Sequence, residues 1–198
     1  ASAGRDVWVI SDEIYNEILY HPPFASVAER TGDYERLVVV NGFSKAYAMT
    51  GWRVGYVCAP ADLLEGIVKV HQYQIMSAPT IAQDAAVVAL QGAEHDVQRM
   101  VAEYDRRRRM FVAGLNEIGL PTFEPKGAFY AFPSIRPTGL SSDEFSERLL
   151  FEEKVAAVPG SAFGPSGEGH VRMTLATGYD QLQEALERIG RFVASTAV

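Results

Sequence analysis

The chain has 198 residues, of which 47% are hydrophobic and 22% charged, and its formal net charge is −7. This composition is ordinary for a globular protein, and the length allows one large domain or two small ones. The negative charge argues against nucleic acid as a partner. No apolar run approaches the roughly 20 residues that span a bilayer, so no membrane partner is expected either.

Cysteine and histidine usage narrows the chemistry further. Cys58 is the only cysteine in the sequence, which rules out an intrachain disulfide and fits a reducing cytoplasm. The histidines do not show the spacing of metal ligands, so we predict no metal site. They are His21, His71, His95 and His170. The basic run at 106–109 follows acidic residues within a helical pattern and is interpreted as a solvated or ion-paired helix face.

The first part of the chain alternates between apolar runs and polar or helical segments. Residues 7–10, 37–40 and 54–59 are short continuous apolar runs, which are typical of strands buried on both faces. A helix is predicted after residue 60. A longer helical pattern extends from 77 to 119, with a bend near Gly92 and an end at Gly119. Such a helix would connect two domains, which we place at 1–95 and 96–198.

The second part has the pattern of a small α+β unit. Strands are predicted at 127–132, 155–158 and 170–176, and residues 141–144 (SSDE) resemble a capping box at the start of a helix. The strand at 170–176 alternates clearly and places Arg172 on its polar face. The glycine-rich segment 164–169 is expected to be a loop, because it leads into a strand and not into a phosphate-binding helix. An amphipathic helix ends the chain.

Two cations lie between the second and third predicted strands, Lys45 and Arg53. Desolvation and a nearby cation each favour the neutral, nucleophilic form of a lysine amine. An arginine can clamp a phosphate with two hydrogen bonds, and Ser44 offers a hydroxyl beside it. Asp12 directly follows the first predicted strand, and open α/β sheets place ligand-binding residues at such strand ends.

A lysine nucleophile, a phosphate-binding arginine and a buried carboxylate, here Asp12, together meet the requirements of pyridoxal phosphate. Taken singly, each residue has a simpler explanation. A lysine at a strand end is usually solvated, and an aspartate there usually caps a turn. The residues alone therefore leave both interpretations open.

Residues 42–55 (GFSKAYAMTGWRVG) resemble the lysine-attachment motif of the class I/II pyridoxal-phosphate aminotransferases of fold type I. Residues 11–15 (SDEIY) resemble the segment of that family that contacts the cofactor ring. Residues 127–130 (GAFY), 159–163 (PGSAF) and 171–172 (VR) resemble its small domain. The resemblance implies an α/β fold in which part of the large domain, with a mostly parallel sheet, is followed by a small α+β domain.

The resemblance also implies a role for each candidate residue. Lys45 would form the Schiff base with the cofactor and transfer the proton during catalysis. Asp12 would pair with the pyridine nitrogen, and Tyr15 would donate a hydrogen bond to the ring 3′-oxygen. Ser44 and Arg53 would bind the phosphate.

Arg172 would bind the substrate α-carboxylate. The implied enzyme transfers an amino group between an L-amino acid and a 2-oxo acid, as aspartate aminotransferase does, and acts as a homodimer. One departure from the family pattern is Gly42, where some relatives have a serine that contacts the phosphate. The side chain of the substrate is not specified by these residues.

Two other functions remain open. Lyases, synthases and decarboxylases of the same fold use the same cofactor, and fold-level analogy cannot separate them from aminotransferases. A non-enzymatic remnant or a regulatory module is the second alternative.

Members of the family are usually about twice as long as this chain. Their N-terminal half supplies much of the large sheet, a phosphate-binding turn, an aromatic residue stacked on the cofactor and an asparagine beside the ring. The chain is therefore interpreted as a C-terminal half. Alone, it is expected to have an incomplete site and an unpaired sheet edge, which favours aggregation.

Overall fold

A computed structural model of the chain describes residues 7–21, 23–31 and 35–196. Contacts between residues divide the chain into two compact units, Ala1–Val101 and Ala102–Val198. The division falls within helix α4 (Glu94–Glu117). The domain limits predicted at 95 and 96 fall in the same helix and stay a proposal.

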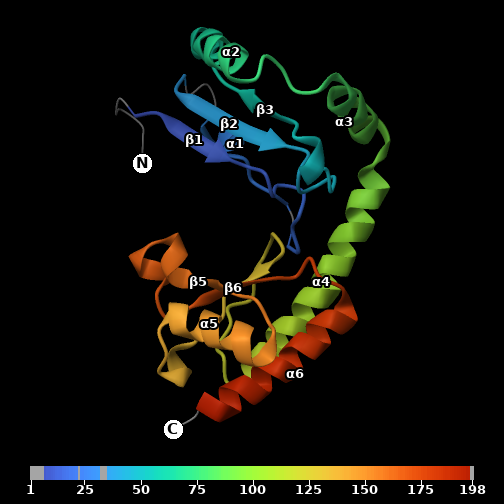
Figure 1. Cartoon of the computed structure of the whole chain (residues 1–198). Coiled ribbons are helices and arrows are strands. Elements are labelled where there is room, and N and C mark those ends of the chain that lie inside the picture. Colours follow the sequence, from blue (N-terminus) through green and yellow to red (C-terminus); the bar gives the residue numbers. More distant parts are fainter. Residues whose placement is uncertain (1–6, 22, 32–34, 197–198) are drawn as a thin grey trace. The chain divides into compact units, whose positions relative to one another are not determined.

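The first unit contains a sheet with the strand order β1-β2-β3 (Figure 1). These strands are β1 (Val9–Asp12), β2 (Leu37–Gly42) and β3 (Gly55–Cys58), close to the three apolar runs. β1 and β2 are parallel, whereas β2 and β3 are antiparallel. The parallel character implied by the family resemblance is thus seen in one of the two pairings.

The prediction that the strands are buried on both faces is wrong for β1 and also for β3, where Gly55, Tyr56 and Cys58 are exposed. Ile10 is 72% exposed, and Val7 and Trp8 are also exposed. β1 is an edge strand, and among the described residues only β2 pairs with it. An apolar edge strand of this kind exposes backbone groups that can pair with another strand.

Three helices belong to the first unit: α1 (Val27–Thr31), α2 (Ala61–Gln74) and α3 (Thr80–Gly92). The long helical pattern is interrupted at Ala93, which separates α3 from α4 and confirms the predicted bend near Gly92. Gly119 follows the end of α4 with φ = +88°, a left-handed conformation that glycine adopts without strain.

The core of the first unit holds the segment between β2 and β3. Phe43 and Met49 of this segment are buried against Ala86 of α3. Tyr47 and Val54 pack against the same cluster. The long polar segment that contains Lys45 is therefore held by apolar contacts at both of its ends.

The second unit has an antiparallel sheet with the order β4-β6-β5. Its strands, β4 (Tyr130–Ala131), β5 (Val158–Pro159) and β6 (Val171–Thr174), are shorter than predicted. The predicted alternation of β6 is confirmed, because Val171 and Met173 are buried while Arg172 is half-buried and Thr174 exposed.

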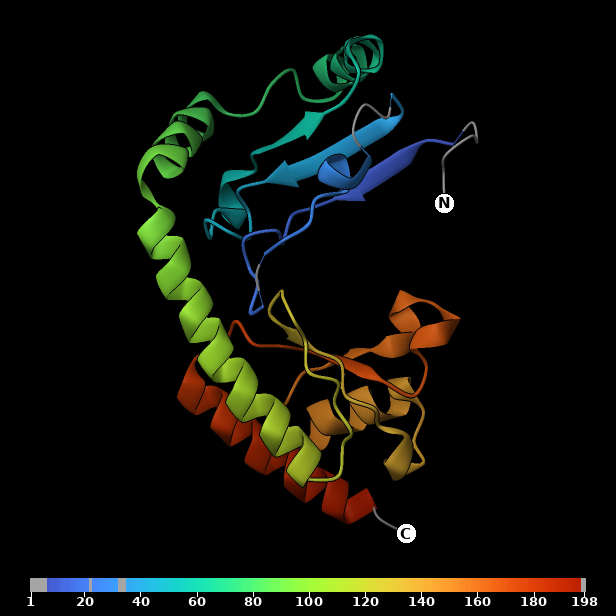
Figure 2. The same ribbon diagram turned by 180° about the vertical axis from the view of Figure 1, so that it is seen from behind.

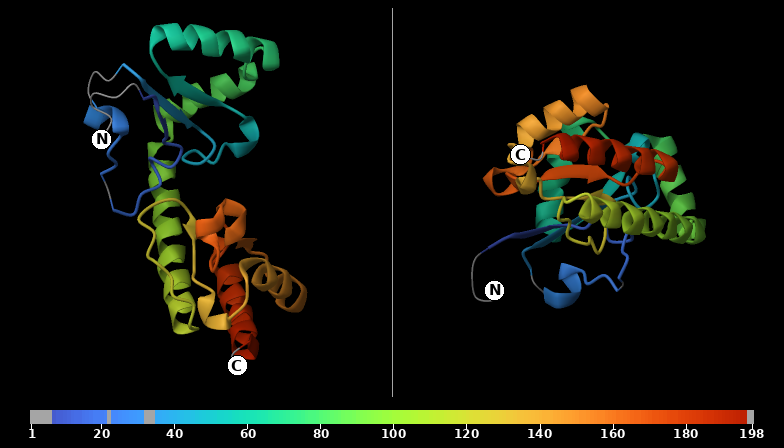
Figure 3. Two further views of the ribbon diagram at one scale, coloured as in Figure 1. Left: turned by 90° about the vertical axis from the view of Figure 1, so that its left-hand side faces the viewer. Right: turned by 90° about the horizontal axis from the view of Figure 1, so that it is seen from below.

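Helices cover this sheet. α6 (Tyr179–Thr196) lies beside the C-terminal part of α4, as Figure 2 shows from behind. The two helices approach closely, since a Cβ atom at Gly114 would lie 2.6 Å from Leu186 Cδ1. α5 (Ser142–Glu153) packs beside α6 (Figure 3). The predicted capping box at Ser141 and Glu144 is confirmed at the start of α5.

Short 3₁₀ helices complete the chain: η1 (Thr50–Trp52), η2 (Arg136–Thr138), η3 (Gly160–Phe163) and η4 (Pro165–Gly167). η4 forms within the glycine-rich segment that was expected to be a loop. The Glu168 carboxylate accepts hydrogen bonds from Ser142 N at 2.8 Å and Ser142 Oγ at 2.7 Å. These bonds tie the segment to the start of α5.

The basic run on α4 is ion-paired, as predicted, but it is not uniformly solvated. Arg109 is exposed and contacts Asp105 at 2.6 Å. Arg108 is only 1% exposed and contacts both Asp105 at 2.7 Å and Glu124 at 2.5 Å. Upstream on the same helix, hydrogen bonds from Arg106 and Arg107 lower the pKa of Glu103 to about 2.

Within the described residues, no helix has the length and apolar character needed to cross a membrane. The same residues contain no cluster of three or more His, Cys, Asp or Glu side chains that could hold a metal ion.

Candidate functional site

The topology of the first sheet brings the predicted site residues to one edge of it, namely the edge at which β1 and β2 end and β3 begins. Asp12, the last residue of β1, is paired with Val40 near the end of the parallel strand β2. Residues 43–54 then connect β2 to the antiparallel strand β3, whose first residue, Gly55, lies opposite Gly42. Asp12, Lys45 and Arg53 therefore all leave the sheet at the same edge, although 41 positions separate the first from the last in sequence (53 − 12 = 41).

Gly42 and Gly55 allow β2 and β3 to approach closely at this edge. A Cβ atom at Gly42 would lie 3.0 Å from Gly55 Cα, and one at Gly55 would lie 2.9 Å from the Asn41 carbonyl oxygen. A serine at position 42, as in some relatives of the family, would meet the backbone of β3. The departure noted at Gly42 thus has a local structural reason.

Backbone hydrogen bonds fold the segment that contains Lys45 into a compact turn. The carbonyl oxygen of Phe43 accepts bonds from Tyr47 N at 3.3 Å and from Met49 N at 3.2 Å. Ala48 and Arg53 adopt left-handed conformations, with φ of 53° and 55°. Such conformations are uncommon for residues with a side chain and cluster at functional sites. Lys45 is half-buried within this turn.

Thr50 connects the two residues that are candidates for phosphate binding. Its hydroxyl donates to the Ser44 carbonyl oxygen at 2.7 Å, and its own carbonyl accepts from Arg53 Nη1 at 2.9 Å. Ser44 and Arg53 are thus held by the same residue. The sequence analysis did not identify Thr50, and its place between the lysine and the arginine was the only signal for it.

The two adjacent acids after β1 have different environments. The expectation that Asp12 is a buried carboxylate is wrong for this chain: Asp12 is exposed, and its Oδ1 accepts a bond from Ile14 N at 3.2 Å. Glu13 is buried, and its carboxylate accepts bonds from two serine hydroxyls and one backbone amide. Glu13 therefore anchors the chain, while Asp12 remains accessible to a ligand. The chain turns after Asp12, and Tyr15 lies half-buried within this turn.

Two tyrosines that the sequence analysis did not identify pack around the turn. The Phe43 ring lies 5.3 Å from the Tyr47 ring and 6.1 Å from the Tyr56 ring. Burial, reinforced by the negative charge of Glu17, raises the pKa of both phenols. Both tyrosines are therefore neutral near pH 7, and their hydroxyl groups can donate hydrogen bonds.

Arg172 belongs to the second unit and is half-buried on β6. Its guanidinium carbon lies 4.5 Å from the centre of the Tyr130 ring and 4.7 Å from the centre of the Phe163 ring. Among the described residues, no carboxylate forms an ion pair with it. Its charge is thus held by aromatic rings and remains available to an anion.

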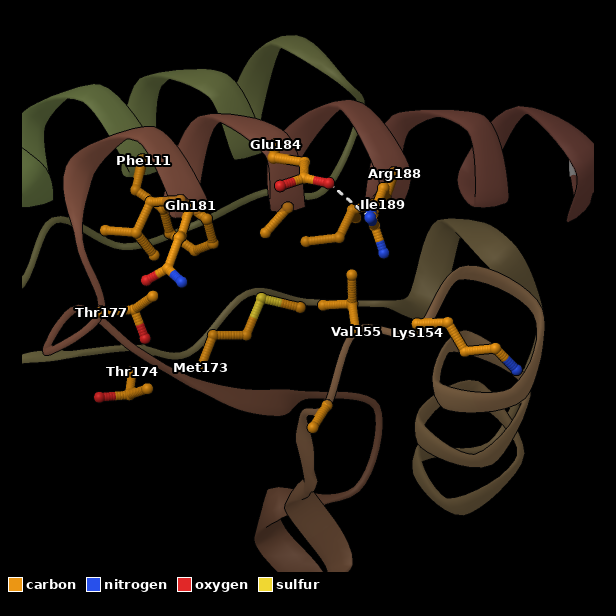
Figure 4. Close-up of a pocket in the computed structure, with 13 residues that line it drawn as sticks. Phe111, Lys154, Val155, Met173, Thr174, Thr177, Gln181, Glu184, Arg188 and Ile189 are labelled. Carbon is orange, nitrogen blue, oxygen red and sulfur yellow. Dashed lines mark hydrogen bonds and ion pairs between the residues drawn. The ribbon is translucent and has the colours of Figure 1, made fainter.

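A separate cavity of about 390 Å³ lies in the second unit, between α6, the end of β6 and residues 154–156 (Figure 4). None of the predicted site residues lines it. The cations at its rim are engaged, since Arg188 pairs with Glu184 and Lys154 Nζ donates to the Phe151 carbonyl at 2.7 Å. Arg188 is thus paired with an acid, whereas Lys154 pairs with no carboxylate among the described residues.

Comparison with known proteins identifies the family to which this chain belongs. Residues 2–189 match the family of class I and II aminotransferases. The chain belongs to this family. Enzymes of this family use pyridoxal phosphate.

Two of the similar relatives have names that state a substrate. Over 188 residues, the chain is 51% identical to aspartate aminotransferase of Pyrococcus abyssi, covering 93% of this chain and 48% of the relative. It is 47% identical over 188 residues to aromatic-amino-acid aminotransferase 2 of Thermococcus litoralis, with the same two shares, 93% and 48%. The chain thus spans about half the length of the curated relatives it matches.

The solved structures agree with the sequence comparison. The crystal structure of the aromatic aminotransferase from Pyrococcus horikoshii OT3 superposes with a TM-score of 0.95 at 49% identity. The match covers 98% of this chain and 52% of that structure. The family and the fold class inferred from the sequence are confirmed.

Proposed function

We propose that this chain is the C-terminal half of a pyridoxal-phosphate-dependent aminotransferase, which transfers an amino group between an L-amino acid and a 2-oxo acid. The observation that carries the proposal is the common sheet edge from which Asp12, Lys45 and Arg53 project. Membership of the aminotransferase family supports it.

The residues at this edge fit the cofactor chemically. Pyridoxal phosphate has an aldehyde, a basic ring nitrogen and a phosphate, and the edge offers an amine, a carboxylate and a guanidinium. Arg53 donates to one backbone carbonyl and pairs with no carboxylate among the described residues, so its charge is available to a phosphate. When bound, the cofactor supplies an electron sink that acidifies the α-carbon of an amino acid.

Each residue has a distinct task in this proposal. Lys45 would hold the cofactor covalently through Nζ and, once free, would hold and return a proton. Asp12 keeps the ring nitrogen protonated, and Tyr15 donates a hydrogen bond to the ring oxygen. Ser44 and Arg53 bind the phosphate, in positions that Thr50 maintains.

Arg172 binds the substrate carboxylate through a charge-assisted pair of hydrogen bonds. The names of the relatives favour transamination over the lyase or synthase alternative. They do not choose the substrate, because one acts on aspartate and the other on aromatic amino acids.

The remaining parts of the proposal concern the assembly. We place residues 1–95 in the cofactor-binding domain and residues 96–198 in the small domain. The complete enzyme is proposed to be a cytoplasmic homodimer that acts on small molecules and not on nucleic acid or membranes. Membership of the aminotransferase family supports this picture.

The test is covalent capture of the cofactor in the complete enzyme. After borohydride reduction, mass spectrometry should find the cofactor on the peptide that contains Lys45. Lys45→Ala should abolish this attachment and lower turnover by roughly 10²- to 10⁴-fold. Lys69→Ala is the matched control, because Lys69 is exposed and, among the described residues, forms an ion pair with Glu65 alone, at 2.6 Å.

A single-turnover experiment separates the alternatives. With amino acid alone, an aminotransferase releases one equivalent of 2-oxo acid and then stops, whereas a lyase continues to turn over. Attachment that persists in Lys45→Ala, or continued turnover without a 2-oxo acid acceptor, would contradict the proposal.

A further inference from the structure

We propose that Tyr130 and Phe163 are positioning residues that hold the Arg172 guanidinium ready for a substrate carboxylate while leaving its hydrogen-bond donors unused. This inference rests on the proposed function, in which Arg172 binds that carboxylate. It assigns the orientation of the arginine to two aromatic rings and not to a protein carboxylate.

The contact geometry is the first support. The guanidinium carbon lies over both rings, at 4.5 Å from the centre of Tyr130 and 4.7 Å from the centre of Phe163. Each ring is a separate contact, so the guanidinium is restrained by two side chains and not by one. Both distances are well within the roughly 6 Å over which a cation is attracted to a ring face.

The kind of partner is the second support. A protein carboxylate would neutralise Arg172 and occupy its N–H groups, and a substrate would then have to displace it. An aromatic face attracts the positive charge without accepting the in-plane N–H bonds that recognise a carboxylate. Among the described residues, Arg172 contacts two aromatic rings and forms no ion pair with a carboxylate. Its donors are therefore kept for a ligand.

Tyr130 reaches Arg172 through the register of the sheet. Tyr130 on β4 is paired with Thr174 on β6, so its side chain lies on the same face as Thr174 and Arg172. A residue diagonally across an antiparallel pair is within reach of an aromatic side chain. The sheet thus fixes the first ring.

Phe163 reaches the same guanidinium from a different element, at the end of η3. Its ring meets the Phe132 ring at 6.1 Å and 79°, and Phe132 in turn stacks on His170 at 5.2 Å and 2°. Phe163 is therefore held by a contact with another aromatic ring as well as by its place in η3.

The exposure of these rings argues against a role in core packing alone. Phe163 is 49% exposed and Phe132 is 38% exposed, whereas the core aromatic residues Phe111 and Phe145 are at most 2% exposed. Large apolar side chains that stay exposed in a row beside an unpaired cation suit a binding surface better than a structural core.

The test distinguishes the contribution of the ligand's carboxylate to binding from the contribution of the rest of the ligand. In the complete enzyme, binding of propanoate and of its uncharged analogue propanamide is measured by competition against the substrate. We expect Phe163→Leu to weaken propanoate binding about 5-fold, since one cation–π contact is lost, and to leave propanamide unchanged. With substrate, KM should rise by a similar factor while kcat changes little.

Three variants control this result. Phe163→Tyr keeps the ring and should bind propanoate like the unmodified enzyme. Phe123→Leu removes an equally large but unconnected exposed ring and should have no effect. Tyr130→Leu should reproduce the Phe163→Leu phenotype independently.

The decisive comparison uses an Arg172→Met background, in which Phe163→Leu should cause no further loss of propanoate binding. The inference is overturned if both analogues weaken equally, or if the effect of Phe163→Leu persists without Arg172. Its failure is distinct from that of the proposed function. Absence of cofactor on Lys45 refutes the function, whereas a Lys45-bound cofactor with ring-independent carboxylate binding refutes only this inference.

Discussion

Arg108 on α4 is a charged side chain in the interior of the second unit. Its guanidinium contacts Asp105 at 2.7 Å and Glu124 at 2.5 Å. Burial opposes ionisation of Asp105, but hydrogen bonds from Arg108 and Arg109 outweigh it and lower the pKa of that carboxyl. A buried charge is tolerated only when such partners compensate for its lost hydration.

Replacing Arg108 with alanine should lower the free energy of unfolding by about 3 kcal/mol, because it leaves a cavity and removes the buried ion-pair partner that Asp105 and Glu124 share. Arg109→Ala is the control. Arg109 contacts the same Asp105 but is exposed, so its loss should cost less than about 1 kcal/mol. Urea unfolding of the complete enzyme, followed by far-UV circular dichroism, measures both. Equal effects of the two substitutions would contradict the conclusion that the buried Arg108 stabilises the fold more than the exposed Arg109.

At the scale of elements, η3 and η4 are joined through two glycines. A Cβ atom at Gly160 would lie 1.9 Å from the Gly167 carbonyl oxygen, and one at Gly167 would lie 2.1 Å from the Gly160 carbonyl oxygen. No side chain fits between these backbones. The pair therefore fixes where η3 begins, at Gly160, and Phe163 is the last residue of the same short helix.

Gly160→Ala should force the two short helices apart and destabilise the second unit by about 3 kcal/mol. It should also weaken propanoate binding, because Phe163 moves with η3. Gly92→Ala is the matched control, since a Cβ atom there would meet nothing within 4 Å, and we expect a change within about 0.5 kcal/mol. Unfolding and propanoate competition are the measurements. Wild-type binding in a stable Gly160→Ala enzyme would refute the link between η3 and Arg172.

At the scale of the whole molecule, the first unit exposes an unusual amount of apolar surface. Large apolar side chains are exposed on β1, on α2 with the turn after it, and on α3. They include Ile10, Val68, Tyr73, Met76, Ile81 and Val88. The curated relatives are about twice as long as this chain. The remainder of such an enzyme would supply a cover for these side chains.

We expect the 198-residue chain alone to self-associate, because exposed apolar surface and an unpaired strand edge favour association. Sedimentation velocity should show species larger than 21.7 kDa. Co-expression with an N-terminal half of the family should suppress them. Ile10→Lys should reduce association, whereas Phe123→Lys in the second unit should not. A monodisperse 21.7 kDa chain with transaminase turnover would contradict both this prediction and the half-enzyme proposal.

The sequence by itself determined the local elements and the identity of the lysine segment. Periodicity located the strands around β1, β2, β3 and β6, the break near Gly92 and the capping box at Ser141, because each depends on residues close together in the chain. The motif around Lys45 could also be recognised from the sequence, because its residues are contiguous in the chain. Its site residues followed from a family resemblance, and their roles stay predictions.

Only the tertiary structure decided which residues are buried and which meet across the chain. It showed that Ile10 is exposed, that Glu13 rather than Asp12 is the buried acid, and that Arg108 lies inside a basic run. It also placed Tyr130 and Phe163 against Arg172. Burial and long-range contacts depend on the packing of elements distant in sequence, so no local pattern encodes them.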